Sequence, residues 1–298
     1  MADLRLATRG SALARTQATW VAEQVAHHHP GIEVELVIVA TSGDIDKDTP
    51  VTHLTELGAF VRSVQHAVLD GRADAAVHSC KDLPTQGPEG LTAIYPLREA
   101  AWDVLCGTPL DDLPSGARVG TGSPRRAAQL AVLRPDLQIE GIRGNVDTRL
   151  GKVASGEFDA VVLAEAGLRR LGRHDWSMRF TLDQMVPAPA QGALAIEVGT
   201  DSPAADIVRS LDDGATRLAV TAERHVLALT HLGCRGALGA YAIPDDDGSV
   251  HLTGFVEDED GPRRGVVAAT HADAAGDLCQ LLRIPIAAAP LGASPGAG

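Results

Sequence analysis

Aromatic side chains make up only 3% of the 298 residues, which leaves little material for a nucleic-acid site built from stacked rings. Cysteine is equally scarce, and Cys80, Cys106, Cys234 and Cys279 lie far apart with no CxxC pair among them. This spacing favours neither structural zinc nor a disulfide framework. We therefore predict no metal site, and each cysteine is expected to be a small buried hydrophobic residue.

Long apolar runs are also missing. No uninterrupted stretch approaches the roughly 18 residues that span a bilayer, and the opening MADLRLATRG has no signal-peptide core. Positive charge is limited too, because 39 acidic residues outnumber 26 basic ones and give a net charge of -13. These features predict a soluble cytoplasmic protein that binds neither nucleic acid nor a membrane.

What remains is a globular composition with 45% hydrophobic and 22% charged residues. Short apolar runs alternate with amphipathic stretches, a rhythm typical of α/β proteins with largely parallel sheets. Strands are predicted at Leu4–Ala7, Val34–Val39, Asp74–His78, Arg118–Gly120, Leu137–Ile142, Asp159–Leu163 and Leu194–Val198. Helices are predicted at Ser11–His27, Phe60–Leu69, Pro124–Arg134 and Val146–Ala154.

The pattern changes near Asp213. A helical stretch over Ala215–His231 is followed by three strand candidates and a final helix near Asp273–Leu282. The strand candidates are Leu238–Ile243, Val250–Phe255 and Gly265–Ala269. This part of the chain is predicted to be a separate small α+β domain.

Arginine is unevenly distributed along the acidic chain. The segment from Arg118 to Arg149 holds six arginines and three acidic residues, so it is locally basic. Arginine is also the side chain that grips carboxylate or phosphate with two parallel hydrogen bonds. We infer a local anion-binding site on a protein that is acidic overall.

Three strand-to-helix junctions place arginine beside a helix start. Ser11, Ser123 and Asn145 are predicted N-caps, and arginine stands near each of them. Free N–H groups at helix starts attract anions, and three such ends would hold several carboxylates or phosphates together. Each junction alone is weak, since an arginine near a helix start is often merely solvated. Their recurrence is what favours a binding site.

A further pair follows the strand predicted over Asp74–His78. Lys81 and Asp82 stand beyond its carboxyl end, where ligands sit in parallel sheets. The pair has two interpretations. It is either a surface ion pair in a turn, worth little energetically, or a carboxylate kept ionised to stabilise developing positive charge.

Seven strings then identify a family. ATRGS, AVHSCKDLP, VGTGSPRRAAQL, IRGNVDTRL, LAEAGLRRLG, PAPAQGALAIE and TAER followed by LGC resemble porphobilinogen deaminase (hydroxymethylbilane synthase) in order and spacing. The resemblance implies two domains with the type II topology of periplasmic binding proteins and a small α+β C-terminal domain. The implied division is 1–96 with 192–212, then 97–191, then 213–298, and the strand over Leu194–Val198 would return to the first domain.

The family joins four porphobilinogen molecules head to tail onto a dipyrromethane primer, releases ammonia, and hydrolyses off the linear hydroxymethylbilane for porphyrin and heme synthesis. The resemblance places the primer on Cys234 through a thioether and makes this chain a transferase. Porphobilinogen and oligopyrroles are the implied partners, and a monomer is expected. Asp82 matches the catalytic aspartate, whose carboxylate accepts pyrrole N–H groups and stabilises the cationic azafulvene formed when ammonia leaves.

The remaining matched positions bind the carboxylates of the pyrrole side chains. Implied for the cofactor are Lys81, Asp82, Ser123, Arg125 and Arg126, with Cys234 as the attachment point. Implied for the substrate are Arg9, Ser11, Arg143, Arg149 and Arg170. The neighbouring Arg169 is interpreted as a solvated partner.

One segment departs from the family pattern. Between Thr52 and Phe60, around His53 and Leu57, the chain lacks the two lysines of a lysine- and glycine-rich active-site loop. Because Arg62 in the next helix can compensate, we expect altered kinetics and no loss of activity. Two alternatives stay open, a non-catalytic receptor for a small anion and an inactive paralogue. The receptor would need neither Cys234 nor Asp82, and both are present.

Overall fold

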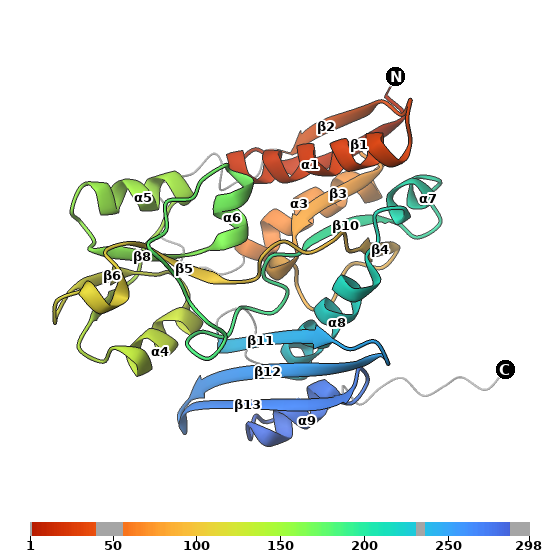
Figure 1. Ribbon diagram of the computed structural model, residues 1–298. Helices are drawn as coiled ribbons and strands as arrows, with labels where there is room; N and C mark the ends of the chain where they lie inside the picture. Colours follow the sequence, from red (N-terminus) through yellow and green to blue (C-terminus); the bar gives the residue numbers. More distant parts are fainter. Residues whose placement is uncertain (1, 40–55, 231–235, 287–298) are drawn as a thin grey trace.

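The computed structural model describes residues 2–39, 56–230 and 236–286, without the side chains of 56–60, and these residues form three β-sheets with helices packed against them (Figure 1). Within these ranges no helix is long and apolar enough to cross a bilayer.

The first sheet has the strand order β2-β1-β3-β10-β4. Its strands are β1 (Leu4–Arg9), β2 (Val34–Val39), β3 (Ala75–Ser79), β4 (Leu91–Ile94) and β10 (Leu194–Gly199). β1 runs parallel to β2 and β3, whereas β10 runs antiparallel to β3 and β4. The helices of this part of the chain are α1 (Ala12–His28), α3 (Glu56–Leu69) and α7 (Ala204–Arg209). The pairing of β10 with β3 confirms that this strand returns to the N-terminal sheet.

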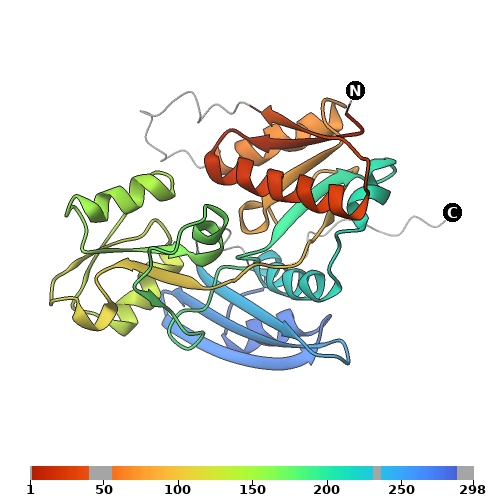
Figure 2. The ribbon, with the colours of Figure 1, turned by 45° about the horizontal axis from the view of Figure 1, so that its top comes forward.

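The second sheet repeats this plan with the order β7-β6-β8-β5-β9. Its strands are β5 (Asp103–Gly107), β6 (Arg118–Gly120), β7 (Gln138–Glu140), β8 (Ala160–Ala164) and β9 (Met178–Arg179). Its helices are α4 (Pro124–Leu133), α5 (Val146–Ala154) and α6 (Glu165–Arg170). Figure 2 shows α1 beside α6, and a Cβ built at Gly167 would lie 3.7 Å from Leu13 Cδ2.

Both sheets thus have three parallel strands followed by one antiparallel strand that arrives from the other half of the chain. β5 enters the second sheet from the N-terminal side, and β10 returns to the first. This exchange defines the type II topology of periplasmic binding proteins. The sheets are therefore mixed, and the prediction of largely parallel sheets missed the antiparallel pairings.

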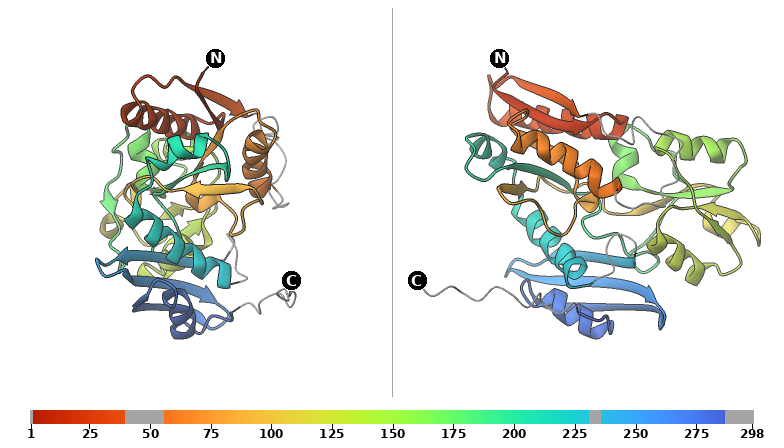
Figure 3. Two further views of the ribbon diagram at one scale, coloured as in Figure 1. Left: turned by 90° about the vertical axis from the view of Figure 1, so that its right-hand side faces the viewer. Right: turned by 180° about the vertical axis from the view of Figure 1, so that it is seen from behind.

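The third sheet consists of β11 (Ala237–Pro244), β12 (Ser249–Asp258) and β13 (Gly261–Thr270), all antiparallel. The helices α8 (Gly214–Leu229) and α9 (Ala274–Leu281) pack with it, and α8 lies between this sheet and the first one (Figures 1 and 3). Buried residues from α8, α9 and the strands form one apolar cluster. Two binding-protein-like units and a small α+β unit describe the fold, whereas the exact boundaries at 96, 191 and 212 remain predictions.

The two chain segments that join the first and second sheets run side by side. Glu99 N donates to Gly192 O at 3.3 Å, and Arg98 Nε donates to Gln191 O at 2.8 Å. Gly192 has φ +88, and a Cβ there would lie 2.4 Å from Glu99 O. Only glycine therefore allows the two segments to approach this closely.

Candidate active site

The carboxyl ends of β1 and β3 lie at the same edge of the first sheet, because the two strands are parallel neighbours. Arg9 ends β1 and is half-buried, and Ser11 caps α1 by accepting a hydrogen bond from Ala14 N at 3.3 Å. On the other strand end, Ser79 Oγ accepts from Gln17 Nε2 at 2.9 Å. The first helix and the end of β3 are therefore tied together at this edge.

Lys81 and Asp82 lie just beyond that edge, in the 3-10 turn η1 (Cys80–Asp82). The Asp82 side chain is exposed. Lys81 is half-buried, its Nζ donates to Gln191 Oε1 at 3.4 Å, and burial lowers its pKa to about 8. A carboxylate open to solvent beside a cation is suited to meet a cationic partner.

Arg125 and Arg126, in the first turn of α4, share one buried carboxylate. Arg125 Nη1 lies 2.7 Å from Asp103 Oδ2, and Arg126 Nη2 lies 2.7 Å from Asp103 Oδ1. Burial opposes ionisation of Asp103, but the two guanidinium groups outweigh it and hold its pKa below the usual range. The first residue of β5 thus compensates part of the positive charge in the first turn of α4.

Gln191 connects this cluster to Lys81. Its Nε2 donates to Asp103 Oδ1 at 2.9 Å and to Ala101 O at 2.7 Å, while its Oε1 accepts from Lys81. Sequence reasoning missed both Asp103 and Gln191. The sequence offered one signal. Asp103 directly precedes the buried run Val104–Cys106, and a polar residue buried with such a run needs a hydrogen-bonding partner.

The other two predicted helix caps are confirmed. Ser123 Oγ accepts from Arg126 N at 3.4 Å, and Asn145 Oδ1 accepts from Thr148 N at 2.9 Å. The loops that carry them meet, because a Cβ at Gly122 would lie 3.0 Å from Ile142 O.

Arg143 and Arg149 flank the second of these caps. Arg143 is exposed and has no ion pair with the described residues. Arg149 Nε donates to Gly144 O at 2.8 Å, and burial together with Arg126 lowers the pKa of Arg149. Neither arginine is neutralised by a carboxylate of the described chain, so both can receive one from a ligand.

Arg169 and Arg170 end α6 and differ in their partners. Arg170 Nη2 donates to Gly192 O at 2.7 Å, and burial lowers the pKa of Arg170 to about 10. Arg169 instead pairs with Glu165 at 2.6 Å and with Glu99 at 3.6 Å. Its partners are therefore acidic residues of the chain, and its side chain stays partly exposed.

The predicted site residues fall into three groups. Lys81, Arg125 and Arg126 are joined through Gln191 and Asp103 in one polar cluster, Asp82 follows Lys81 in the chain, and the charge of Arg149 interacts with that of Arg126. Arg9 and Ser11 lie at the edge of the first sheet, and Ser123, Arg143 and Arg170 lie on the second half. Cys234, with Leu232 and Gly233, falls outside the described residues, as does the lysine-poor segment around His53. The side chain of Leu57 is not described either.

This cluster fits a ligand with several carboxylates, as a dipyrromethane is. Positive charge exceeds negative charge in it, and the buried Nε of Arg125 has no hydrogen-bond partner in the described chain. A buried donor without a partner is costly, so a ligand acceptor would relieve it. The other three cysteines are buried as predicted, and burial raises the pKa of the Cys80 thiol to about 12.

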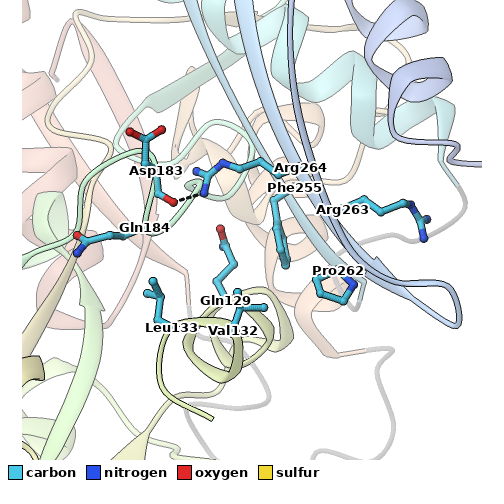
Figure 4. A pocket seen from close by; sticks show the side chains of 9 residues that line it. All are labelled: Gln129, Val132, Leu133, Asp183, Gln184, Phe255, Pro262, Arg263 and Arg264. Atoms are coloured by element: carbon cyan, nitrogen blue, oxygen red, sulfur yellow. Dashed lines mark hydrogen bonds between the residues drawn. The ribbon is translucent and has the colours of Figure 1, made fainter.

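Two cavities of the described structure lie away from this cluster. One of about 160 Å³ separates α4 from the third sheet and is lined by side chains that include Gln129, Phe255 and Arg264 (Figure 4). The other, of about 350 Å³, borders the residues that follow Asp82 and is lined by Leu83, Pro84 and Arg224 among others.

Fold and site together define a binding-protein-like α/β protein with a cluster of cationic side chains at its candidate site. The model of the family described as "Porphobilinogen deaminase, dipyromethane cofactor binding domain" matches residues 4–206. A porphobilinogen deaminase of Maridesulfovibrio salexigens is 46% identical over 267 residues, covering 88% of this chain and 86% of the relative. The Thermobifida fusca porphobilinogen deaminase is 50% identical over 248 residues, covering 80% and 76%. The chain belongs to the porphobilinogen deaminase family.

Solved structures of binding proteins are similar at a lower level. A nutrient binding protein from Burkholderia cenocepacia bound to methionine has a TM-score of 0.41 at 15% identity, covering 69% of this chain and 89% of its own. An arginine-specific periplasmic binding protein from Salmonella typhimurium has a TM-score of 0.39 at 13% identity, covering 72% and 93%.

Proposed function

We propose that this chain is a hydroxymethylbilane synthase: it condenses four porphobilinogen molecules head to tail onto a dipyrromethane held by Cys234, and then hydrolyses off the tetrapyrrole. Each condensation forms one carbon–carbon bond and releases one ammonia. The observation that carries the proposal is Asp82, an exposed carboxylate that directly follows Lys81, whose charge interacts with those of Arg125 and Arg126, in a chain of this family.

Asp82 is assigned the catalytic role. Loss of ammonia leaves positive charge on the substrate's pyrrole, and a fixed carboxylate stabilises that charge where it develops. The bound dipyrromethane supplies the nucleophilic α-carbon of its terminal ring. Lys81 contributes a cation next to Asp82, and its bond to Gln191 fixes its direction.

The arginines are assigned to the acetate and propionate groups. Arg143 and Arg149 have no carboxylate partner among the described residues, so they can bind the incoming ring together with Arg9, Ser11 and Arg170. Arg125 and Arg126 are already paired with Asp103, so they offer a cofactor carboxylate only their remaining N–H groups. Ser123 would contribute its hydroxyl beside them. We further propose a cytoplasmic monomer with the domain division 1–96 with 192–212, 97–191 and 213–298.

Intact-mass spectrometry tests the cofactor assignment. The purified wild-type chain should carry an adduct of two pyrrole rings, and the Cys234→Ser variant should lack it. Cys279→Ser is the matched control, because this buried thiol belongs to the apolar cluster of the C-terminal unit and should leave the adduct in place. An unmodified wild-type mass would favour the anion receptor or the inactive paralogue.

Turnover of porphobilinogen tests the role of Asp82. Asp82→Ala should keep the adduct but consume porphobilinogen at least about a hundredfold more slowly, because one preorganised charge partner is lost. Asp112→Ala is a matched control, since Asp112 is also exposed and also ends a 3-10 turn, η2 (Leu110–Asp112). Near-normal turnover in Asp82→Ala would refute the assignment.

A further inference from the structure

Arg224 on α8 reaches from the C-terminal unit to the segment that carries Asp82. Its Nη1 donates to Cys80 O and to Leu83 O, each at 3.2 Å, and its Nη2 donates to Pro84 O. No acidic side chain of the described residues lies within ion-pair distance of this guanidinium. The guanidinium donates instead to three main-chain carbonyl oxygens.

These carbonyls bracket Lys81 and Asp82. Cys80 O also accepts from Leu83 N at 3.1 Å, the bond that closes the η1 turn, so one guanidinium holds both ends of that turn. The planar fork of arginine presents several N–H donors at fixed angles, and charged donors make stronger hydrogen bonds than neutral ones. A single side chain therefore fixes the course of the main chain on either side of Asp82.

Packing supports only part of this segment: Leu83 belongs to a buried apolar cluster, but a cavity also borders it. The cavity of about 350 Å³ is lined by Leu83, Pro84 and Arg224 among others. Dispersion contacts are absent across a cavity, so residues along it lose part of their support. The hydrogen bonds from the guanidinium support the segment where it borders this cavity.

The helix that carries Arg224 is itself firmly anchored. The adjacent Glu223 is fully buried and accepts from Arg98 Nη1 at 2.7 Å, Ala190 N at 2.6 Å and Ala242 N at 2.9 Å. In the chain, Arg224 also precedes Cys234 by only ten residues. One helix thus fixes the Asp82 turn and leads into the segment of the proposed cofactor thiol.

We propose that Arg224 is a positioning residue that holds the η1 turn so that Asp82 points at the reacting ring. This inference rests on the proposed function. Misplacement of a reacting group by about 1 Å can cost a factor of about a hundred in rate, so the main effect of losing Arg224 should be on kcat.

The test compares Arg224→Met with Arg224→Lys and with Arg217→Met. Methionine keeps the apolar length but removes the donors, so kcat should fall about 10- to 100-fold while KM changes less than about threefold and the cofactor adduct stays. Lysine should restore part of kcat. Arg217 lies on the exposed side of the same helix and pairs with Asp212, so Arg217→Met should behave as wild type.

Two further readouts separate positioning from a general structural role. Amide hydrogen exchange over residues 79–86 should be faster in Arg224→Met, with the rest of the chain unchanged. In Arg224→Ala, millimolar guanidinium should restore turnover, because the cavity leaves room for a free ion beside the vacated position. Wild-type kcat and wild-type exchange in Arg224→Met would overturn the inference. An inactive wild type would instead refute the proposed function, and unchanged exchange in Arg224→Met would then also refute the inference.

Discussion

At the scale of single residues, arginines of this chain divide by their partners. Arg125 and Arg126 pair with Asp103, Arg98 pairs with Glu223, and all these groups are largely buried. Their acidic partners are costly to bury alone, and removing one member of such a pair typically costs about 3 to 5 kcal/mol. Arg143 and Arg149 lack such partners among the described residues. The sequence shows the same side chain in both settings, so only the structure separates supporting arginines from those open to a ligand.

Lys81 gives a pH-dependent prediction. Burial lowers its pKa to about 8 in the folded chain, whereas an unfolded lysine has a pKa of about 10.4. Between these values the unfolded chain binds more protons, so unfolding becomes harder as pH rises. Below about pH 8 both states are protonated and the destabilising effect of the buried charge is fully present.

The measurement uses the Cys234→Ser variant, which should carry no covalent cofactor to alter the site. Its free energy of unfolding in urea, measured from pH 7.5 to 10, should rise relative to that of the double variant Cys234→Ser with Lys81→Met. Replacement by arginine, which stays protonated throughout this range, should also remove the rise. A pH dependence that is identical with and without Lys81 would contradict the assignment.

At the scale of elements, local signals predicted most of the structure. The strands Val34–Val39 and Arg118–Gly120 and the helix Val146–Ala154 match their predicted bounds, and the caps Ser11, Ser123 and Asn145 all accept the predicted hydrogen bonds. Such features depend on neighbours in the chain, which the sequence displays.

The elements that were missed depend on distant partners. β5 has only a short apolar run, and its place is set by antiparallel pairing with β8 and β9, more than fifty residues further along. β4 is paired through β10, about a hundred residues away, and the short helices α6 and α7 carry no strong periodic pattern. Their formation is decided by tertiary contacts that a local pattern does not contain.

Gly192 provides the prediction at this scale. In Gly192→Ala the new Cβ would lie 2.4 Å from Glu99 O and 2.9 Å from Ala100 O, so the two joining segments must move apart. Together with the left-handed φ, this should lower the free energy of unfolding by at least about 3 kcal/mol. Urea denaturation of the wild type and the variant measures this change in the free energy of unfolding.

Gly172→Ala is the control for that substitution. Gly172 also has a left-handed φ, +67, but nothing lies within 4 Å of the position of its Cβ. Gly172→Ala should lower the free energy of unfolding by only about 1 kcal/mol, the cost of the backbone conformation itself. Equal losses at both positions would show that the close approach of the joining segments contributes nothing.

At the scale of the whole molecule, the joining segments and α8 meet in one polar network. Gln191 contacts Asp103 and Lys81, Arg98 contacts Glu223, and Arg224 contacts the Asp82 turn. The motifs indicated which residues belong to the candidate site, and the structure joins three of them, Lys81, Arg125 and Arg126, through Gln191 and Asp103. The supporting side chains could not be predicted, because each acts on a residue far from it in sequence. Cys234 lies outside the described residues, so its role remains a prediction.

The three buried cysteines allow the coupling between units to be measured. Cys80, Cys106 and Cys279 belong to different apolar clusters, and burial raises the pKa of each thiol, so all three should be unreactive in the native state. In the wild type their labelling along a urea series should occur in one transition, because the polar network joins the units.

Glu223→Gln should uncouple the unfolding of the C-terminal unit from that of the rest of the molecule. The buried carboxylate accepts four hydrogen bonds from Arg98, Ala190 and Ala242, and the amide would leave Arg98 buried without its counter-charge, at a cost of about 3 kcal/mol or more. Since the bonds from Arg98 and Ala190 join the C-terminal unit to the joining segments, Cys279 should become reactive at a lower urea concentration than Cys106. Glu140→Gln, which removes an exposed partner of Arg118, should leave both thiols in a single transition. Simultaneous labelling in Glu223→Gln would mean that packing of α8, and not its buried carboxylate, joins the C-terminal unit to the rest of the molecule.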